Sequence, residues 1–267
     1  MDEAEELQQR YGRQIAFEGL GLEGQRALRR ARVLVVGVGG LGSWSAELLA
    51  RAGVGGLRLV DADRVELVNL HRQGLYDEPA ARRGGLKVKA AAQRISQINS
   101  RVRVEPAAER LTRDTIARLA GDADLLVDGS DNFATRFLIN DYCVMTNRPW
   151  VFGGVVQAQG QVMTIPGAAG PCLRCVFEQP PDEDREVRAI TAGVLGTAVA
   201  AVAALQAGEA LKILAGRLDL ASPYLLRLDL WNNQLQRIDV RRSREGVECP
   251  CCGHRRFEFL QGGGASL

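Results

Sequence analysis

The chain has 267 residues, a length that suits one large domain or two small ones. Its hydrophobic fraction of 46% and charged fraction of 25% are typical of a globular protein and exclude a disordered, collagen-like or coiled-coil chain. The 34 lysine and arginine residues nearly balance the 32 aspartate and glutamate residues. The resulting net charge of +2 favours neither a nucleic acid nor an anionic membrane as the main partner.

The sequence predicts no export signal and no membrane segment. Residues 1–14 are acidic and polar, whereas a secretory signal needs a basic start and an apolar run. The longest uncharged stretch, residues 189–208, has the length of a membrane span, but alanine, glycine, threonine and glutamine dominate it and predict a helix buried in protein. We therefore expect a cytoplasmic protein, in which the six cysteines are reduced thiols or metal ligands.

Helical and strand patterns alternate along the first half of the chain. Residues 5–31 have helical periodicity, and residues 32–38 form a valine-rich run that is typical of a strand buried on both faces of a parallel sheet. A glycine loop, a helix over 43–52 and a strand over 56–61 complete a βαβ unit. Further helices are expected at 87–98, 114–120 and 136–146, and further strands at 102–106, 123–128 and 150–154.

The pattern becomes richer in glycine and β-formers after residue 154. Hairpins are followed by a polar loop over 178–188, the small-residue helix, and two strands within 224–241. The predicted fold is α/β: a Rossmann-like, doubly wound, mostly parallel sheet with a β-rich, zinc-clamped C-terminal portion. The expected divisions are a nucleotide-binding domain over 1–154, a carrier-docking and zinc-binding portion over 155–258, and a flexible tail over 259–267.

The first strand leads into a G-x-G-x-x-G loop that opens a helix. Glycines permit a tight turn and a close approach of phosphate to the backbone, and the helix N-terminus attracts anions. Asp61 ends the next strand, where a carboxylate can bind ribose hydroxyls. This context favours a nucleotide site over a merely tight turn, but the pattern accepts NAD as readily as ATP. The loop residues are Gly37, Gly39, Gly40, Leu41 and Gly42.

Residues downstream of the loop favour ATP. A triphosphate carries more charge than the pyrophosphate bridge of NAD, and Asn69, Arg72 and Lys87 supply suitable donors and cations. Asp131 follows a buried strand at the edge where doubly wound sheets bind ligands, and a carboxylate beside a triphosphate is most simply a Mg²⁺ ligand. Any one of these residues could be a solvated surface charge, but their combination indicates ATP. The candidate site also includes Asp63, Ser130 and Asn132.

Two C-x-x-C pairs predict a structural zinc site. Cys172, Cys175, Cys249 and Cys252 offer four thiolates for a tetrahedral Zn²⁺, and four protein ligands leave no open position for catalysis. The pairs lie far apart in the sequence, so the metal would clamp the C-terminal end onto a distant loop. A thioredoxin-type redox pair is disfavoured because neither pair opens a helix in a βαβ unit. Cys251 could compete as a ligand.

These motifs together resemble the ThiF/MoeB/HesA adenylyltransferases, bacterial relatives of ubiquitin-activating enzymes. The resemblance covers nearly the whole chain and rests on residues 10–14, the glycine loop, residues 69–73, Lys87, residues 130–132 and the paired C-x-x-C. It implies ATP-dependent adenylation of the C-terminal Gly-Gly carboxylate of a small ubiquitin-like (β-grasp) sulfur-carrier protein. Pyrophosphate would be released, and the acyl-adenylate would then be converted to a thiocarboxylate.

The resemblance also implies a role for each polar residue. The glycine loop, Asn69, Arg72 and Lys87 would bind the phosphates, Asp61 the ribose, and Asp131 the Mg²⁺. Arg13 would reach the ATP bound by a partner subunit, which implies a homodimer. Catalysis would then consist of positioning and charge neutralisation at phosphorus, without an acid–base pair.

One position departs from the pattern. Ala189 stands where many family members carry a cysteine that binds the carrier covalently, so we expect adenylation without such an intermediate at that position and a separate sulfur donor.

Three alternatives stay open. The first is an NAD-dependent oxidoreductase and the second an inactive scaffold, and neither would have a use for Arg13, Arg72 and Lys87. The third is adenylation of a non-protein carboxylate, such as one on a modified tRNA base, which the small net charge makes less favoured.

Overall fold

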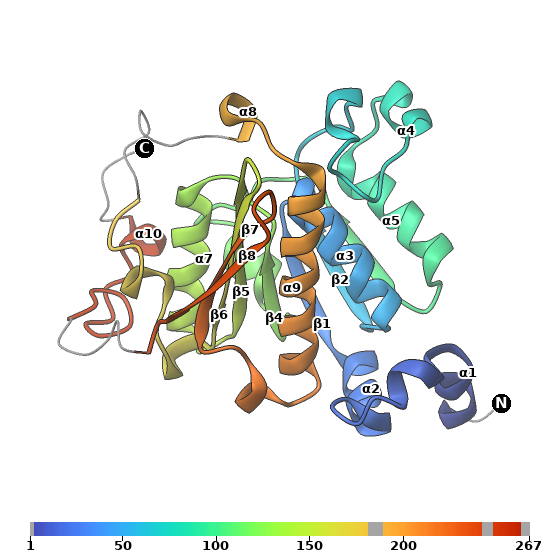
Figure 1. Ribbon diagram of the computed structural model, residues 1–267, viewed down its shortest axis with the longest axis horizontal. Coiled ribbons are helices and arrows are strands. Elements are labelled where there is room, and N and C mark those ends of the chain that lie inside the picture. Colours follow the sequence, from blue (N-terminus) through green and yellow to red (C-terminus); the bar gives the residue numbers. More distant parts are fainter. Residues whose placement is uncertain (1–2, 181–188, 242–247, 263–267) are drawn as a thin grey trace.

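One sheet of eight strands organises the computed structural model, which describes residues 3–180, 189–241 and 248–262. The strand order is β3-β2-β1-β4-β5-β6-β7-β8 (Figure 1). The first five strands in this order pair in parallel and the rest pair antiparallel. The bounds are β1 Arg32–Val36, β2 Gly56–Val60, β3 Arg103–Ala107, β4 Leu125–Asp128, β5 Trp150–Val156, β6 Gln159–Ile165, β7 Tyr224–Asp229 and β8 Gln234–Asp239. The predicted Rossmann-like sheet with a β-rich C-terminal portion is confirmed.

Helices cover both faces of the sheet. On one face, α3 (Gly40–Ala52), α5 (Lys87–Ile98) and α9 (Gly196–Leu214) share an apolar core with Val33 and Val35 of β1. On the other face, α6 (Ile116–Ala120) and α7 (Phe133–Met145) share a second core with the alternate residues of the same strand. The remaining helices are α1 Glu3–Ile15, α2 Gly21–Arg30, η1 Leu67–Asn69, α4 Glu78–Arg83, η2 Gly167–Ala169, η3 Leu173–Cys175, α8 Ala189–Ala192, η5 Leu218–Leu220 and α10 Glu258–Gln261.

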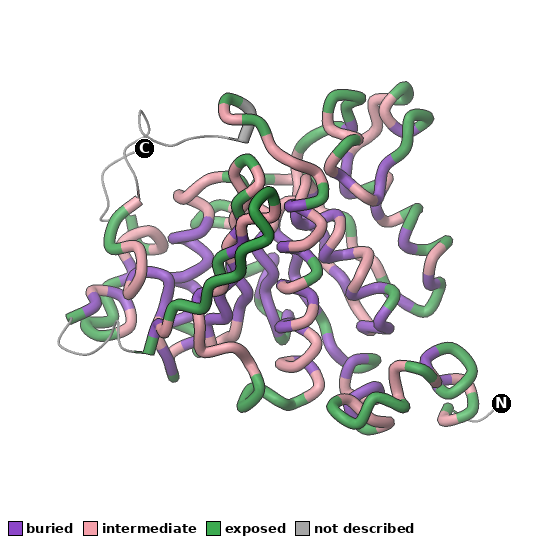
Figure 2. The backbone as a smooth tube through the Cα atoms, in the orientation of Figure 1, coloured by how far each residue is buried: buried purple, intermediate pink, exposed green. Residues whose placement is uncertain are grey.

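One side of the long apolar helix α9 lies in the protein interior. By length and composition it could cross a membrane. In the fold it packs beside α3 and against the sheet, and buried stretches alternate along it with less buried ones (Figure 2). Val202, Ala203, Ala207 and Ala210 belong to the core. Small side chains let the helix lie close to its neighbours, which is the role that its composition predicts.

Several local features differ from the sequence predictions. Helix α7 starts at Phe133 rather than at 136, because the Asn132 side chain accepts a hydrogen bond from the Thr135 amide and caps the helix. The prediction of a flexible tail from residue 259 is wrong for residues 259–261, which belong to α10. This short helix is held by Phe259, whose ring lies 4.9 Å from that of Phe137 between centroids. Most of the predicted polar loop, at 181–188, and residues 263–267 lie outside the described residues.

Candidate nucleotide site and metal centre

The two predicted nucleotide-binding segments meet where the sheet reverses its winding order. Strand β1 pairs with β2 on one side and β4 on the other, and Val36 at its end lies opposite Asp128. From these strand ends the chain turns into α3 on one face and α7 on the other. Such a switch point forms a crevice outside the carboxyl ends of the strands, where doubly wound proteins bind ligands.

Three glycines allow the two strand ends to interlock. Gly37 has a φ of +77°, a backbone conformation that favours glycine. A Cβ at Gly42 would lie 1.8 Å from the Gly37 carbonyl oxygen, and one at Gly129 would lie 2.4 Å from the same atom. Gly37, Gly42 and Gly129 are therefore required by the packing of the loops themselves.

Gly39 differs from these three because its surroundings leave room, whereas a Cβ at Gly40 would lie 3.1 Å from Cγ1 of Val199. Among the described residues, the atom nearest to a Cβ at Gly39 is Nε2 of Gln73, at 3.7 Å. The Gln73 side chain is buried, and its Oε1 has no hydrogen-bond partner within the described part of the chain. Leu41 points into the core, so its backbone alone can face a ligand. Open space beside a glycine, with an unpaired buried oxygen next to it, suits a bound polar ligand.

Asp61 holds the glycine loop in shape. Its Oδ2 accepts a hydrogen bond from the Val38 amide at 2.8 Å, and its Oδ1 accepts one from the Asp63 amide at 2.8 Å. Tyr76 donates to the Val38 carbonyl at 2.7 Å. Burial, with a smaller effect of the Asp61 charge, raises the pKa of Tyr76, so the phenol remains a donor. A carboxylate oxygen can accept more than one hydrogen bond, so Asp61 can shape the loop and still accept from a ribose.

Lys87 lies at the start of α5, beside the end of β2. Its amide donates to the Asp63 carbonyl at 2.9 Å, and its Nζ lies 3.0 Å from Asp63 Oδ2. The lysine side chain is only 8% exposed, whereas that of Asp63 is 61% exposed. The structure thus pairs two predicted site residues with each other: a buried cation and a carboxylate at the rim.

Arg72 lies against the glycine loop. Its Cδ is 4.0 Å from where a Cβ at Gly40 would be. Its Nη2 donates to Asn69 Oδ1 at 2.6 Å, Nη1 lies 2.9 Å from His71 Nε2, and its carbonyl accepts from Trp44 Nε1 at 3.1 Å. None of these partners is a carboxylate, so none of these contacts neutralises the positive charge of the guanidinium, which suits an anionic ligand.

The loop between β4 and α7 exposes Asp131. Ser130 is turned inward, because its amide and hydroxyl donate to Asp128 Oδ1 at 2.9 and 2.5 Å. Asn132 caps α7 by accepting from the Thr135 amide at 2.9 Å. The side chain of Asp131 is exposed, and Asn132 Nδ2 lies 3.3 Å from its Oδ1. Ser130 and Asn132 thus shape the loop, whereas Asp131 can bind a cation.

A buried ion pair beneath this loop was not predicted from the sequence. Arg136 Nε lies 3.3 Å from Asp128 Oδ2, and Arg136 Nη2 donates to the Ser130 carbonyl at 3.0 Å and the Gly153 carbonyl at 3.2 Å. Burial raises the pKa of Asp128, and the Arg136 charge opposes this rise. An arginine in the first turn of a helix that follows a ligand-edge loop is the sequence signal that could have identified it. Gln73 had no such signal beyond its place after Arg72.

Arg13 lies apart from the other candidate residues. The glycine loop leads into the first turn of α3, whereas α1 packs at the far ends of α3 and α5 (Figure 1). There Gln14 Nε2 donates to the Ala52 carbonyl at 2.9 Å, and Arg10 Nη1 donates to Asn99 Oδ1 at 3.1 Å. The 13 residues of α3 separate these ends by about 20 Å. The exposed Arg13 side chain therefore does not belong to the crevice of its own chain.

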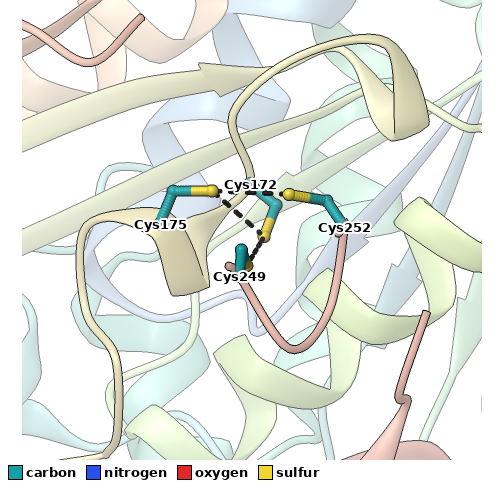
Figure 3. A group of neighbouring side chains, drawn as sticks. All are labelled: Cys172, Cys175, Cys249 and Cys252. Atoms are coloured by element: carbon teal, nitrogen blue, oxygen red, sulfur yellow. Dashed lines mark hydrogen bonds between the residues drawn. The ribbon is translucent and has the colours of Figure 1, made fainter. Parts of the chain in front are cut away.

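The four predicted zinc ligands converge from two distant segments. The Sγ distances are 3.7 Å for Cys172–Cys249, 3.4 Å for Cys175–Cys252 and 4.0 Å for Cys172–Cys175, and all four sulfurs lie within 4.8 Å of one another (Figure 3). A tetrahedral zinc with Zn–S bonds of about 2.3 Å requires sulfurs about 3.8 Å apart. The arrangement therefore fits a closed four-thiolate site.

The thiols perturb one another strongly. Hydrogen bonding with Cys172 lowers the pKa of Cys249 and raises the pKa values of Cys175 and Cys252. Four sulfurs at these distances cannot all carry negative charge without a cation, which a divalent metal supplies. The Cys251 sulfur lies outside this group of four.

The fold, with a glycine loop at its switch point, places the protein in the doubly wound α/β class. A structure of the Microcin C7 biosynthetic enzyme MccB in complex with N-formylated MccA superposes with a TM-score of 0.79 and 22% identity, over 95% of this chain and 77% of MccB. At that level of identity the likeness concerns the fold alone. The ThiF family profile matches residues 11–251, so the chain belongs to the ThiF family.

Relatives of known name support this membership. A sulfur carrier protein adenylyltransferase from Thermus thermophilus is 42% identical over 249 residues, which are 91% of this chain and 90% of the relative. An "adenylyltransferase and sulfurtransferase MOCS3" from Sus scrofa is 43% identical over 246 residues, covering 92% of this chain but 53% of that protein. The chain thus spans nearly all of the bacterial relative and about half of the mammalian one.

Proposed function

We propose that the protein adenylates the C-terminal Gly-Gly carboxylate of a small ubiquitin-like sulfur-carrier protein with ATP. The observation that carries this proposal is the set of residues that follow the ends of β1, β2 and β4: an open glycine turn at Gly39, the cations Arg72 and Lys87, and the exposed carboxylate of Asp131. Cations of this kind suit a triphosphate better than a dinucleotide, and the names of the relatives agree with this chemistry.

In the proposed reaction, this chain's residues bind and orient ATP while the carrier supplies the nucleophile. A carboxylate oxygen of the carrier forms a bond to the α-phosphorus, and the bond from that phosphorus to the bridging oxygen breaks, so pyrophosphate leaves. Arg72 and Lys87 neutralise the charge of the phosphates, Asn69 donates a hydrogen bond that orients them, and Asp61 binds the ribose. Asp131 would hold a Mg²⁺ that offsets charge on the leaving group. Zinc in the four-cysteine group would be structural, because it leaves no open coordination position.

We also propose that a second copy of the chain completes the site. Because α1 is anchored at the far ends of α3 and α5, Arg13 lies away from the nucleotide site of its own chain. It would instead reach the phosphates bound by a neighbouring subunit, and the active form would then be a homodimer. Mixing Arg13→Ala and Asp131→Ala proteins tests this arrangement. If the subunits exchange, half of the dimers regain one intact site, so about a quarter of the wild-type activity should return. No recovery despite demonstrated exchange of subunits would contradict the shared site.

Further proposals concern the carrier and the sulfur. The carrier would dock on the β-rich portion after Val155, and a separate protein or small molecule would donate the sulfur.

Because Ala189 cannot form a thioester, no covalent carrier–enzyme intermediate should arise at that position. This residue begins α8, and its side chain lies outside the described part. Mass spectrometry after reaction with ATP and carrier should find no covalent adduct on the peptide that contains residue 189. We propose that the reaction takes place in the cytoplasm.

Binding calorimetry separates this function from the oxidoreductase alternative. ATP with Mg²⁺ should bind, and Lys87→Ala should weaken that binding, whereas NADH should give no heat. Tight NADH binding without ATP binding would overturn the proposal. Adenylation of a non-protein carboxylate is distinguished by the substrate, since it would proceed without any carrier protein.

A further inference from the structure

One asparagine bridges the two segments that carry the cysteine ligands. Asn140 lies in the middle of α7 and is fully buried. Its Oδ1 accepts a hydrogen bond from the Leu173 amide at 2.8 Å, next to Cys172 in the first C-x-x-C loop. Its Nδ2 lies 3.2 Å from the Sγ of Cys251, in the second loop. Both loops are thus held by a single side chain on a helix that supplies no ligand.

The second loop offers one thiol too many. In the sequence Cys249-Pro250-Cys251-Cys252, any two of three sulfurs could pair with the first loop. The structure brings Cys249 and Cys252 together with Cys172 and Cys175, whereas the fully buried Cys251 points to Asn140. The hydrogen bond from the Asn140 amide gives the Cys251 sulfur a partner outside the group of four sulfurs.

The neighbouring residues of α7 strengthen this support. Asp141 Oδ2 accepts from the Phe259 amide at 2.9 Å and so holds α10 next to the second loop. Arg174, inside the first loop, is almost fully buried and pairs with Glu258 of α10 at 3.1 Å. Helix α7 therefore contacts and supports both cysteine loops.

We infer that Asn140 is a positioning residue that selects the metal ligands. It holds both loops against α7 and keeps Cys251 as a hydrogen-bonded anchor, which leaves Cys249 and Cys252 to bind the metal with Cys172 and Cys175. Groups that orient metal ligands in this way commonly contribute a factor of about 10–100 to metal affinity. The inference concerns metal binding alone and does not depend on the proposed adenylation.

Cobalt substitution tests the choice of ligands. In reduced full-length protein loaded with Co²⁺, Cys251→Ser should keep the wild-type four-thiolate absorption, because serine can still accept the hydrogen bond from Asn140. Cys249→Ser should lose thiolate-to-cobalt intensity, because it removes a ligand. If Cys251→Ser loses that intensity and Cys249→Ser does not, Cys251 is the ligand and the inference fails.

Zinc affinity tests the role of Asn140 itself. Asn140→Leu removes both hydrogen bonds at similar volume and should weaken zinc binding about 10–100-fold in competition with a chromophoric chelator. Asn99→Leu is the matched control, because Asn99 is a buried, hydrogen-bonded asparagine at the far end of α5. Unchanged affinity in Asn140→Leu, or equal weakening in both variants, would overturn the role. Should Asn140→Leu fail to fold, the serine variants still decide which sulfurs bind the metal.

Discussion

The switch-point crevice and the four-cysteine centre are built in opposite ways. At the switch point, each cation has a side-chain partner: the buried Lys87 pairs with the exposed carboxylate of Asp63, and Arg72 donates to the amide oxygen of Asn69. In the cysteine centre the sulfurs face one another, and Asn140 and Asp141 of α7 hold the loops from behind. The first region is assembled from segments that follow the strand ends, and the second from loops far apart in the chain.

This contrast matches what each region has to do. A site that binds and releases a ligand in every cycle needs charges whose internal partners can be exchanged for the ligand, and an exposed carboxylate such as Asp131 meets that need. A site that binds one ion permanently gains from burial and from a fixed ligand geometry. Substitutions in the crevice should therefore affect the reaction, whereas changes in the cysteine centre should affect stability.

Removal of the metal should have the largest effect on stability. Zinc at about 1,000 times its dissociation constant stabilises a folded protein by roughly 4 kcal/mol, and for a chain of this size that corresponds to a fall in Tm of about 10 °C on removal. Calorimetry before and after treatment with a chelator and reductant measures this difference. An unchanged Tm in protein shown to be metal-free would break the contrast between the two regions.

Substitution of Asp131 should have the largest effect on the reaction. Asp131→Ala should lower the rate of ATP–pyrophosphate exchange by about 10²–10³-fold, as expected for the loss of one preorganised electrostatic contact, and leave Tm nearly unchanged. Asp114→Ala, at another exposed aspartate, is the control and should retain activity. Equal exchange rates in the two variants would show that Asp131 has no role in the reaction.

Substitution of Lys87 should have a somewhat smaller effect. Lys87→Met should slow the exchange by roughly 10²-fold, because the buried cation beside the crevice is lost. The unpaired Asp63 is largely exposed and can be solvated, so stability should change little. Lys89→Met changes an exposed lysine of the same helix and should behave as wild type. A large loss of stability with normal exchange would give Lys87 a structural role instead.

Loss of the Arg58–Asp122 ion pair, which lies outside both regions, should have the smallest effect on stability. Arg58 Nη1 lies 2.5 Å from Asp122 Oδ1, and this hydrogen bond lowers the pKa of Asp122. The stabilisation is present above the ordinary carboxyl pKa and is lost as the pH falls through the lowered folded value. Because Asp122 is partly exposed, Asp122→Asn should cost no more than about 1 kcal/mol at neutral pH and nothing at strongly acidic pH. Urea titrations at several pH values check this, and a constant difference would contradict it.

Local sequence patterns predicted the fold, and the fold places most of the candidate residues after the carboxyl ends of β1, β2 and β4. The glycine spacing, the buried apolar runs that lead to Asp61 and Asp128, and the two C-x-x-C pairs are short-range signals with a direct structural meaning. The Asp128–Arg136 pair had a local signal that was overlooked. The unpaired oxygen of Gln73 and the bridge made by Asn140 could not be predicted, because each depends on contacts between segments that only the folded chain brings together. The short helix α10 was missed for the same reason: Phe259 packs on Phe137.

ATP–pyrophosphate exchange in the presence of a carrier protein shows whether the chain adenylates a Gly-Gly carboxylate. The exchange of labelled pyrophosphate into ATP is measured with a panel of small β-grasp proteins that end in Gly-Gly, and with the same proteins shortened by the last glycine. We expect exchange with one full-length carrier and none with its shortened form. Exchange that does not depend on the carrier, or its absence with every carrier although ATP binds, would contradict this expectation.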